Sequence, residues 1–270
     1  MNINILRLLK IVFLIISIII FVFPCYYMIV VSLSKKTSIE AGAVIPDFYF
    51  GNFMSMTVSP WADTIINSLI TTISCVILTI FITFPAAYAF SRLKFTADKH
   101  LFFWFLTNRM APPVAMVLPY LIIWRSLGIW DTTYGLILAY FVFNIPVGVW
   151  LFSSFMGNIP KEIDEQAFID GFSLWQYFRK IFIPASLPSI GVVAFFIWLF
   201  TWSEMFFASV LTSFNSKTIN AQLFVTLGRV GYGVQYDLAS AAGVITIIPG
   251  LILLYWARTY LAKGFTFGRL

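Results

Sequence analysis

Six long apolar segments dominate the sequence, and they restrict its possible folds more than any other feature. The first, residues 11–33, contains 23 residues without a charged side chain. As an α-helix it would extend about 35 Å, which is enough to cross a bilayer. A cleaved signal peptide is the alternative, but its apolar core would be only about 7–15 residues long and would precede a small-residue cleavage site. We therefore expect this segment to be a membrane helix.

Five further segments have the same character, and together the six predict a chain that crosses the membrane repeatedly. Hydrophobic residues make up 60% of the 270 residues and charged residues only 10%, whereas soluble domains are about 25% charged. We therefore predict an all-α polytopic membrane protein with six transmembrane helices, formed by residues 1–270 as a single domain. The other expected spans are residues 64–91, 101–124, 133–156, 185–212 and 238–257.

The loops between these spans carry charges that predict an orientation. With the amino terminus in the cytoplasm, cytoplasmic segments would hold 11 Lys and Arg residues and outer segments 5, while Arg109 lies within a span. Positive residues concentrate on the cytoplasmic side of membrane proteins, so both termini are expected there. The same loops account for the net charge of +6. The sequence has no basic cluster suited to a nucleic-acid groove, so we expect no nucleic-acid partner.

The cytoplasmic loop 157–184 is expected to form two short helices joined at Gly171. Pro160 suits a first helical turn, where its missing N–H has no cost, and glycine readily takes the left-handed conformation that ends a helix. Ser173, followed three residues later by Gln176, predicts a capping box at the start of the second helix. Such a compact helical knob at a membrane surface is suited to docking into a groove on a partner protein.

This loop resembles the EAA loop of permease subunits of ATP-binding-cassette (ABC) importers. The family pattern is E-A-A-x-x-x-G, nine residues, then I-x-L-P, and this chain keeps the spacing while Gln166 and Ile183 replace two of its residues. The resemblance implies that the loop is the coupling site for an ATPase subunit. The residues it assigns to that site are Glu165, Gln166, Ala167, Asp170, Gly171, Ile181 and Pro184.

Other stretches resemble the carbohydrate-importing, maltose-type branch of that family. They include residues 86–92, 109–113, 127–132, 202–206 and 263–266, although Ser203 stands where the branch usually has Asn. The resemblance implies a type I importer fold in a bacterial-type inner membrane. The implied partners are a homologous permease subunit, two ABC ATPase subunits, an extracytoplasmic solute-binding protein and membrane lipid. The implied solute is a sugar, polyol or oligosaccharide.

The sequence lacks the patterns that ATP-binding, metal-binding and nucleophilic sites require. It has no phosphate-binding loop of the G-x-x-x-x-G-K-[ST] type, so we expect no cofactor in this chain and ATP to be bound by separate ATPase subunits. The single histidine, His100, lies in a loop, and Cys25 and Cys75 lie in apolar segments. A metal site needs clustered ligands and a nucleophile needs a nearby base. Catalytic residues, a metal and enzyme activity are therefore not expected.

Four polar or aromatic residues within the spans are candidates for the translocation pathway: Arg109, Asn144, Trp202 and Glu204. Ionisable side chains are costly in lipid, so Arg109 and Glu204 should face protein or water. Arg109 could equally pair between helices or meet solute hydroxyl groups. For Glu204 we expect a structural or gating role near the outer side, without direct pairing to Arg109.

Two alternatives to the sugar permease remain open from the sequence. An importer permease for another solute class would share the same loop and spans. An autonomous secondary carrier or channel would need its own coupling-ion site, which usually involves paired intramembrane acids or repeated halves. A single intramembrane Glu and a single intramembrane Arg favour that alternative only weakly.

Overall fold

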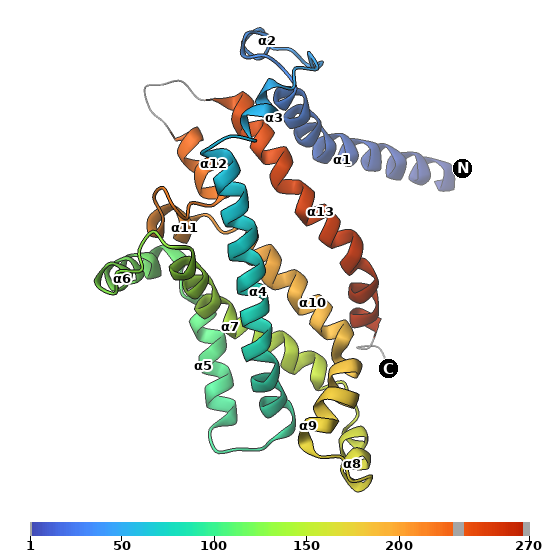
Figure 1. Ribbon diagram of the computed structural model, residues 1–270. Coiled ribbons are helices and arrows are strands. Elements are labelled where there is room, and N and C mark those ends of the chain that lie inside the picture. Colours follow the sequence, from blue (N-terminus) through green and yellow to red (C-terminus); the bar gives the residue numbers. More distant parts are fainter. Residues whose placement is uncertain (1, 229–234, 267–270) are drawn as a thin grey trace. The chain divides into compact units, whose positions relative to one another are not determined.

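A computed structural model of the chain describes residues 2–228 and 235–266, and within these ranges every regular element is a helix (Figure 1). Five spans are long and apolar enough to cross a membrane, and a sixth results if one bent helix pair counts as a span. The predicted all-helical, multi-pass architecture is therefore confirmed. The spans contain α1 (Asn2–Ser32), α4 (Trp61–Arg92), α7 (Thr133–Met156), α10 (Ile183–Trp202) and α13 (Tyr236–Thr266).

The expected third span, residues 101–124, is not one continuous helix. It consists of α5 (Asp98–Met110) and α6 (Pro113–Ser126), which are bent by 95° relative to each other. Ala111 and Pro112 between them have extended backbones, both with ψ of 129°. A residue before proline is pushed out of the helical region, and proline offers no N–H to continue the ladder. Two consecutive prolines therefore break this span.

The expected fifth span, residues 185–212, also has different limits. The helix α10 continues a π-helical turn, Phe178–Phe182, and ends at Trp202. Pro184 gives the π turn a local cause, because it cannot donate a backbone hydrogen bond and its ring crowds the preceding turn. A separate short helix, α11 (Phe206–Leu211), follows α10. Glu204 therefore lies between two helices instead of inside a span.

The chain divides into two compact units. The first unit comprises the described parts of Met1–Asp63 and Gln222–Ile248. In it, the Asn52 side-chain amide donates hydrogen bonds to the carbonyl oxygens of Ser32 and Ser34, which secures the end of α1. Gly243 of α13 approaches Met28 of α1 so closely that an added Cβ would lie 3.0 Å from the sulfur. Small residues permit such close helix packing in membranes. The short helices of the first unit are α2 (Lys36–Glu40) and α3 (Gly51–Ser55).

The second unit comprises the described parts of Thr64–Ala221 and Pro249–Leu270. Its core lies where α4, α7 and α10 meet, with fully buried Phe152, Phe182 and Ile197. Gly148 of α7 lies so close to Thr83 of α4 that an added Cβ would be only 2.6 Å from the threonine hydroxyl oxygen. Close approach at this glycine therefore holds two long helices together. The short helices that begin in this unit are α8 (Lys161–Ile169), α9 (Leu174–Tyr177) and α12 (Ile219–Leu227).

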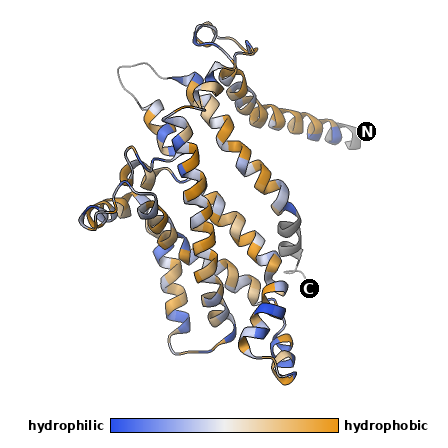
Figure 2. Ribbon diagram, viewed as in Figure 1, coloured by the Kyte–Doolittle hydropathy of each residue, from blue (hydrophilic) through white to orange (hydrophobic). Residues whose placement is uncertain are grey.

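Hydropathy within the second unit follows its elements (Figure 2). Hydrophobic residues occupy most of α4, α7 and α10, whereas hydrophilic residues gather in α8 and at the turn between α4 and α5. These two polar regions lie at the same end of the unit, as Figure 1 shows. This end is therefore the part of the unit suited to water and to soluble partners.

Candidate functional site

The helix α8 ends in the left-handed turn that the sequence predicted at Gly171. This glycine has φ of +81°, and its N–H donates a hydrogen bond to the carbonyl of Phe168. The N–H of Phe172 donates to the carbonyl of Ala167 at 3.0 Å. These two bonds form a Schellman motif, in which a left-handed residue satisfies the last carbonyls of a helix. The turn reverses the chain between α8 and α9.

The second helix of the loop begins with the predicted capping box. The Ser173 hydroxyl accepts a hydrogen bond from the Gln176 N–H, and the Gln176 side-chain oxygen accepts one from the Ser173 N–H at 3.0 Å. Each residue therefore satisfies a backbone donor at the start of α9. Pro160 is the residue just before α8, one position earlier than the first helical turn we expected. We call residues 161–177, which comprise α8, α9 and the turn between them, the helical knob.

The residues assigned to ATPase coupling differ in their exposure. Glu165, Gln166, Asp170, Gly171 and Pro184 are exposed, and Ile181 is half-buried. Ala167 is only 3% exposed. Its small side chain therefore lets α8 pack closely against the rest of this chain.

The outer surface of the helical knob carries large apolar side chains. A surface that contacted only water would be expected to be polar. Ile169 is 83% exposed and Trp175 is 73% exposed, with Leu174 also exposed beside them. Charged residues, including Glu165 and Arg179, lie nearby on the exposed surface. Exposed apolar patches with polar rims are typical of protein-interaction sites.

The inner side of the helical knob is anchored by a buried ion pair that the sequence did not predict. The Arg92 Nε and Asp164 Oδ2 atoms are 2.6 Å apart, with side chains 5% and 12% exposed. Arg92 also donates a hydrogen bond to the carbonyl of Ile159 at 2.8 Å, and the Tyr177 hydroxyl donates one to Asp164. The one available sequence signal was that Asp164 stands three residues before Ala167, on the same face of α8.

Aromatic rings surround this ion pair and join the helical knob to α4. Tyr177 is fully buried. The Tyr88 ring of α4 lies 6.3 Å from the Tyr177 ring and 4.6 Å from the ring of Phe178, which directly follows the knob, and Tyr177 contacts Phe168 with ring centroids 5.2 Å apart. Edge-to-face aromatic packing of this kind stabilises buried contacts. The helical knob is thus packed onto the end of α4 by both charge and aromatic contacts.

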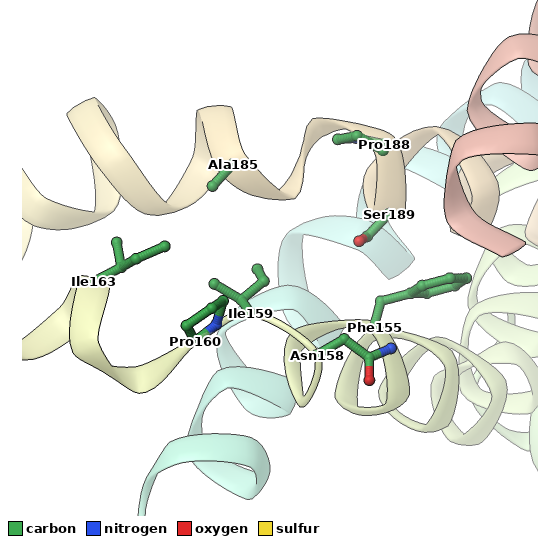
Figure 3. A pocket seen from close by; sticks show the side chains of 8 residues that line it. All are labelled: Phe155, Asn158, Ile159, Pro160, Ile163, Ala185, Pro188 and Ser189. Atoms are coloured by element: carbon green, nitrogen blue, oxygen red, sulfur yellow. The ribbon is translucent and has the colours of Figure 1, made fainter. Parts of the chain in front are cut away.

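A small cavity of about 200 Å³ lies beside the helical knob, between the start of α8 and α10. Figure 3 shows Ile163 and Pro160 on one side and Ala185 and Pro188 on the other. The remaining lining residues are Phe155, Asn158, Ile159 and Ser189. The walls of this cavity are mostly apolar, with Asn158 and Ser189 as its polar side chains.

Arg109 lies in a different setting, at the end of α5. Its guanidinium carbon is 4.3 Å from the centroid of the Phe143 ring and 4.9 Å from that of Phe200. Such cation–π contacts are favourable for an arginine away from water. The residue lines a cavity of about 520 Å³ between α5, α7 and α10. The other lining residues are Leu106, Met110, Pro146, Val147, Trp150, Leu151, Phe155, Val192, Phe196 and Phe200.

Asn144 lies in the interior of the second unit. Its side-chain amide donates a hydrogen bond to the Thr201 hydroxyl at 3.0 Å and a weaker one to the Cys75 sulfur at 3.7 Å. Thr201 in turn donates to the same sulfur. The three residues come from α4, α7 and α10, so this polar cluster joins three long helices.

Glu204 and Trp202 are also held by contacts within the chain. The Glu204 carboxylate accepts hydrogen bonds from the N–H groups of Phe206 and Phe207, at the start of α11. Negative groups are favourable at that end of a helix. Trp202 is 7% exposed and stacks on Trp198. Glu204 and Arg109 therefore bind different partners, as expected.

Asp131 holds a loop, residues 213–216, at the end of the second unit away from the helical knob. Its carboxylate accepts hydrogen bonds from successive N–H groups, including those of Ser213 at 2.7 Å and Phe214 at 3.2 Å. Burial acts to raise the pKa of Asp131, but the hydrogen bonds from residues 213–216 outweigh it and hold the pKa below its usual range. The anchored loop presents Phe214, which is 88% exposed.

Comparison with known proteins gives consistent relatives along nearly the whole chain. Residues 48–267 match the family described as "Binding-protein-dependent transport system inner membrane component". The probable ABC transporter permease protein y4oR of Sinorhizobium fredii is 30% identical over 254 residues, which cover 92% of this chain and 90% of that protein. The trehalose transport system permease protein SugB of Mycobacterium tuberculosis is 28% identical over 256 residues, covering 91% and 90%. The diacetylchitobiose uptake system permease protein DasC of Streptomyces coelicolor is 26% identical over 251 residues, covering 92% and 91%.

Solved structures show the same fold. A chain in the crystal structure of a bacterial ABC transporter involved in the import of the acidic polysaccharide alginate aligns with a TM-score of 0.80 and 20% identity. The alignment covers 95% of this chain and 96% of that one. The family match and the 30% identical relative extend over far more than half of the chain. The protein therefore belongs to the family of binding-protein-dependent transport system inner membrane components and is a permease subunit of an ABC importer.

Proposed function

We propose that this permease subunit takes part in the uptake of a sugar, polyol or oligosaccharide. The observation that carries the solute class is the pair of relatives named for trehalose and diacetylchitobiose, each aligned over most of its length. The fold shared with a chain of the alginate importer is consistent with it. In this proposal the solute pathway lies between this chain and a second, homologous permease subunit.

The helical knob is the proposed docking site for a separate ATPase subunit, and two such subunits serve the complete importer. Support comes from the exposed apolar side chains of Ile169, Leu174 and Trp175 at the surface of an otherwise polar segment. An apolar groove on a partner would bury them. ATP then binds to the partner, because this chain has no phosphate-binding loop. This assignment puts the helical knob and both termini in the cytoplasm.

The loop anchored by Asp131 is the proposed contact for an extracytoplasmic solute-binding protein. It lies at the end of the second unit away from the helical knob and presents an exposed Phe214. Asp131 accepts hydrogen bonds from the loop backbone, so the loop is preorganised and loses little conformational entropy on binding.

Arg109 is the proposed solute contact within the pathway. Its guanidinium carries five N–H donors, which suit hydroxyl oxygens or the carboxylate of an acidic sugar. The aromatic rings around it, including Phe200 and Trp150, offer flat apolar faces to the C–H groups of a sugar ring. Asn144, Trp202 and Glu204 instead support the helices that enclose the pathway.

In the proposed cycle, ATP-driven closure of the ATPase subunits moves the helical knobs and switches the pathway between inward-facing and outward-facing states. This is a rigid-body transition between two states. The solute-binding protein delivers the solute to the outward-facing state. The membrane subunit contributes positioning and the solute path, while the chemistry takes place in the ATPase.

The test is purification of the complex with co-expressed partner subunits, followed by reconstitution in liposomes. ATP-driven uptake and solute-stimulated ATPase activity are measured across neutral sugars, acidic sugars, polyols and amino acids. We expect stimulation by at least one sugar or polyol and none by amino acids. An ATPase-inactive partner variant is the control for passive leakage. Uptake of an amino acid with no response to any carbohydrate would overturn the proposed solute class.

A further inference from the structure

We propose that Arg92, Asp164 and Tyr177 form a clamp that makes α4 and the helical knob move as one rigid body. The proposal rests on the function proposed above and adds positioning residues to it. Arg92 is the last residue of α4, Asp164 belongs to α8 and Tyr177 ends α9. One carboxylate thus joins three helices, since it pairs with Arg92 and accepts the Tyr177 hydroxyl hydrogen bond.

The connectivity of the chain shows why such a clamp is needed. The helical knob is covalently continuous with α7 through residues 157–160, and with α10 through the π turn. Those two helices receive its motion directly. The long helix α4 has no covalent link to the knob and can follow it only through side-chain contacts. The clamp supplies those contacts at the point where α4 ends.

Burial makes the clamp stiff. The Arg92 and Asp164 side chains are 5% and 12% exposed, and Tyr177 is fully buried. Separating a buried ion pair leaves two uncompensated charges in a poorly solvated site. Arg92 also donates a hydrogen bond to the carbonyl of Ile159, and its guanidinium carbon lies 5.9 Å from the Phe182 ring centroid. Sliding of the knob along α4 would break all of these contacts together.

The consequence for transport follows from the other contacts of α4. Thr83 of α4 packs against Gly148 of α7, and Cys75 of α4 accepts the hydrogen bond from Thr201 of α10. Motion delivered to Arg92 therefore reaches the centre of the second unit through one helix. The clamp assigns a mechanical role to three buried residues, which are distinct from the exposed apolar side chains of the knob and do not line the Arg109 cavity.

The first experiment removes the clamp without leaving an orphan charge. The triple variant Arg92→Met, Asp164→Leu and Tyr177→Phe replaces all partners with apolar groups of similar size, an exchange that is often close to neutral for stability. We expect normal insertion. Because Asp164 and Tyr177 belong to the helical knob, ATPase activity and uptake are normalised to the amount of ATPase subunit that co-purifies. Solute-stimulated ATPase activity and uptake should fall roughly tenfold, the size of a typical coupling effect.

Two further variants sharpen this result. Glu40→Gln is the control, because it neutralises an exposed acid of α2, outside the helical knob, and should leave all readouts unchanged. Asp164→Asn alone leaves Arg92 buried without its counter-charge, so it should reduce both stability and coupling. If the triple variant is stable and transports as well as the wild type, the clamp is only structural and the proposal fails.

The second experiment measures the rigid body directly. Spin labels replace Leu93, next to the end of α4, and Glu162, on the exposed side of α8, in a protein lacking Cys25 and Cys75. The distance between the labels should be the same in nucleotide-free and ATP-trapped complexes of the otherwise wild-type protein, and should change or broaden in the triple variant. A distance that differs between the two states in the wild type would overturn the clamp.

The two proposals can fail separately. If the wild-type complex takes up no carbohydrate, the proposed solute class fails, while the distance measurement still decides the clamp. If wild-type uptake is normal and the triple variant is equally active, the clamp fails and the proposed function stands.

Discussion

Gly171 has φ of +81°, and nothing lies within 4 Å of the position that a Cβ would occupy there. The requirement for glycine is therefore conformational and not steric. Arg109 is the opposite case, since its role depends on a side chain that stacks on two rings and lines a cavity. At the scale of single residues, these two positions give the sharpest tests of the docking and pathway proposals.

The change Gly171→Val should weaken binding of the ATPase subunit more than it affects folding. A β-branched residue in the left-handed region costs about 1–2 kcal/mol, and relief of that strain would alter the angle between α8 and α9. The measurement is co-purification of the ATPase subunit with the variant. Gly128→Val is the matched control, because Gly128 has φ of +68° in similarly open space but lies outside the helical knob. Equal retention in both variants would contradict the docking assignment.

The change Arg109→Ala should lower solute uptake while the importer stays assembled. It removes the donors that face the cavity, and a lost hydrogen bond to a charged group costs about 1.5–3 kcal/mol, or roughly ten- to a hundredfold in affinity. Uptake and subunit stoichiometry are measured together. Arg125→Ala is the control, since Arg125 also stacks on an aromatic ring, Trp130, but does not line this cavity. Loss of assembly in Arg109→Ala alone would favour a structural role.

Among the elements, the loop anchored by Asp131 depends most on one side chain. Four successive N–H groups, from Ser213 to Ser216, donate hydrogen bonds to the Asp131 carboxylate. The folded-state pKa lies below the usual value. The ionised Asp131 carboxylate therefore stabilises the folded state fully at every pH above its unfolded-state pKa, including neutral pH. This stabilisation is lost as the pH falls through the folded-state pKa.

The change Asp131→Asn should loosen this loop, because an amide presents one acceptor oxygen and a competing donor to the same N–H groups. Each weakened charged hydrogen bond is worth about 1.5–3 kcal/mol. We expect faster proteolysis near Phe214 and weaker binding of the solute-binding protein, with ATPase-subunit retention unchanged. Limited proteolysis of the reconstituted complex measures the first effect. If the variant is cleaved at the wild-type rate and binds the solute-binding protein with wild-type affinity, the loop does not depend on this carboxylate.

At the scale of the whole molecule, long apolar helices place the chain in a membrane. The helix α1 exposes large apolar side chains such as Phe13 and Phe21 around its surface, which suits lipid or another membrane subunit and not water. The distribution of Lys and Arg in the loops predicts an orientation across the membrane. The proposed orientation has the turn between α4 and α5 in the cytoplasm and the Phe214 loop outside.

Cysteine labelling tests this orientation. In a protein lacking Cys25 and Cys75, His100→Cys should react with a membrane-impermeant thiol reagent only after cells are permeabilised. Phe214→Cys, at an 88% exposed position, should react in intact cells. The opposite labelling pattern would show that the chain has the inverse orientation. Both termini are expected in the cytoplasm as well, and residues 267–270 lie outside the described residues.

Several features could be predicted from the sequence because they depend on neighbouring residues. Long apolar runs identify the membrane spans from their length and hydropathy alone. The left-handed turn at Gly171 and the capping box of Ser173 and Gln176 are set by backbone preferences within a few residues. The spacing around Glu165 was enough to predict the permease family, which the family match and the relatives confirm, while the role of this loop in ATPase coupling stays a prediction.

Only the tertiary structure decided which distant residues meet. Arg92 and Asp164 belong to different helices, and no local pattern links them before the fold brings them to 2.6 Å. The same is true of Asn144 with Cys75 and Thr201. The break at Pro112 was visible as a proline pair, but the 95° bend depends on how α5 and α6 pack. Local preferences act within a turn or two of chain, whereas burial of a charge or a ring is decided by the partners that surround it in space.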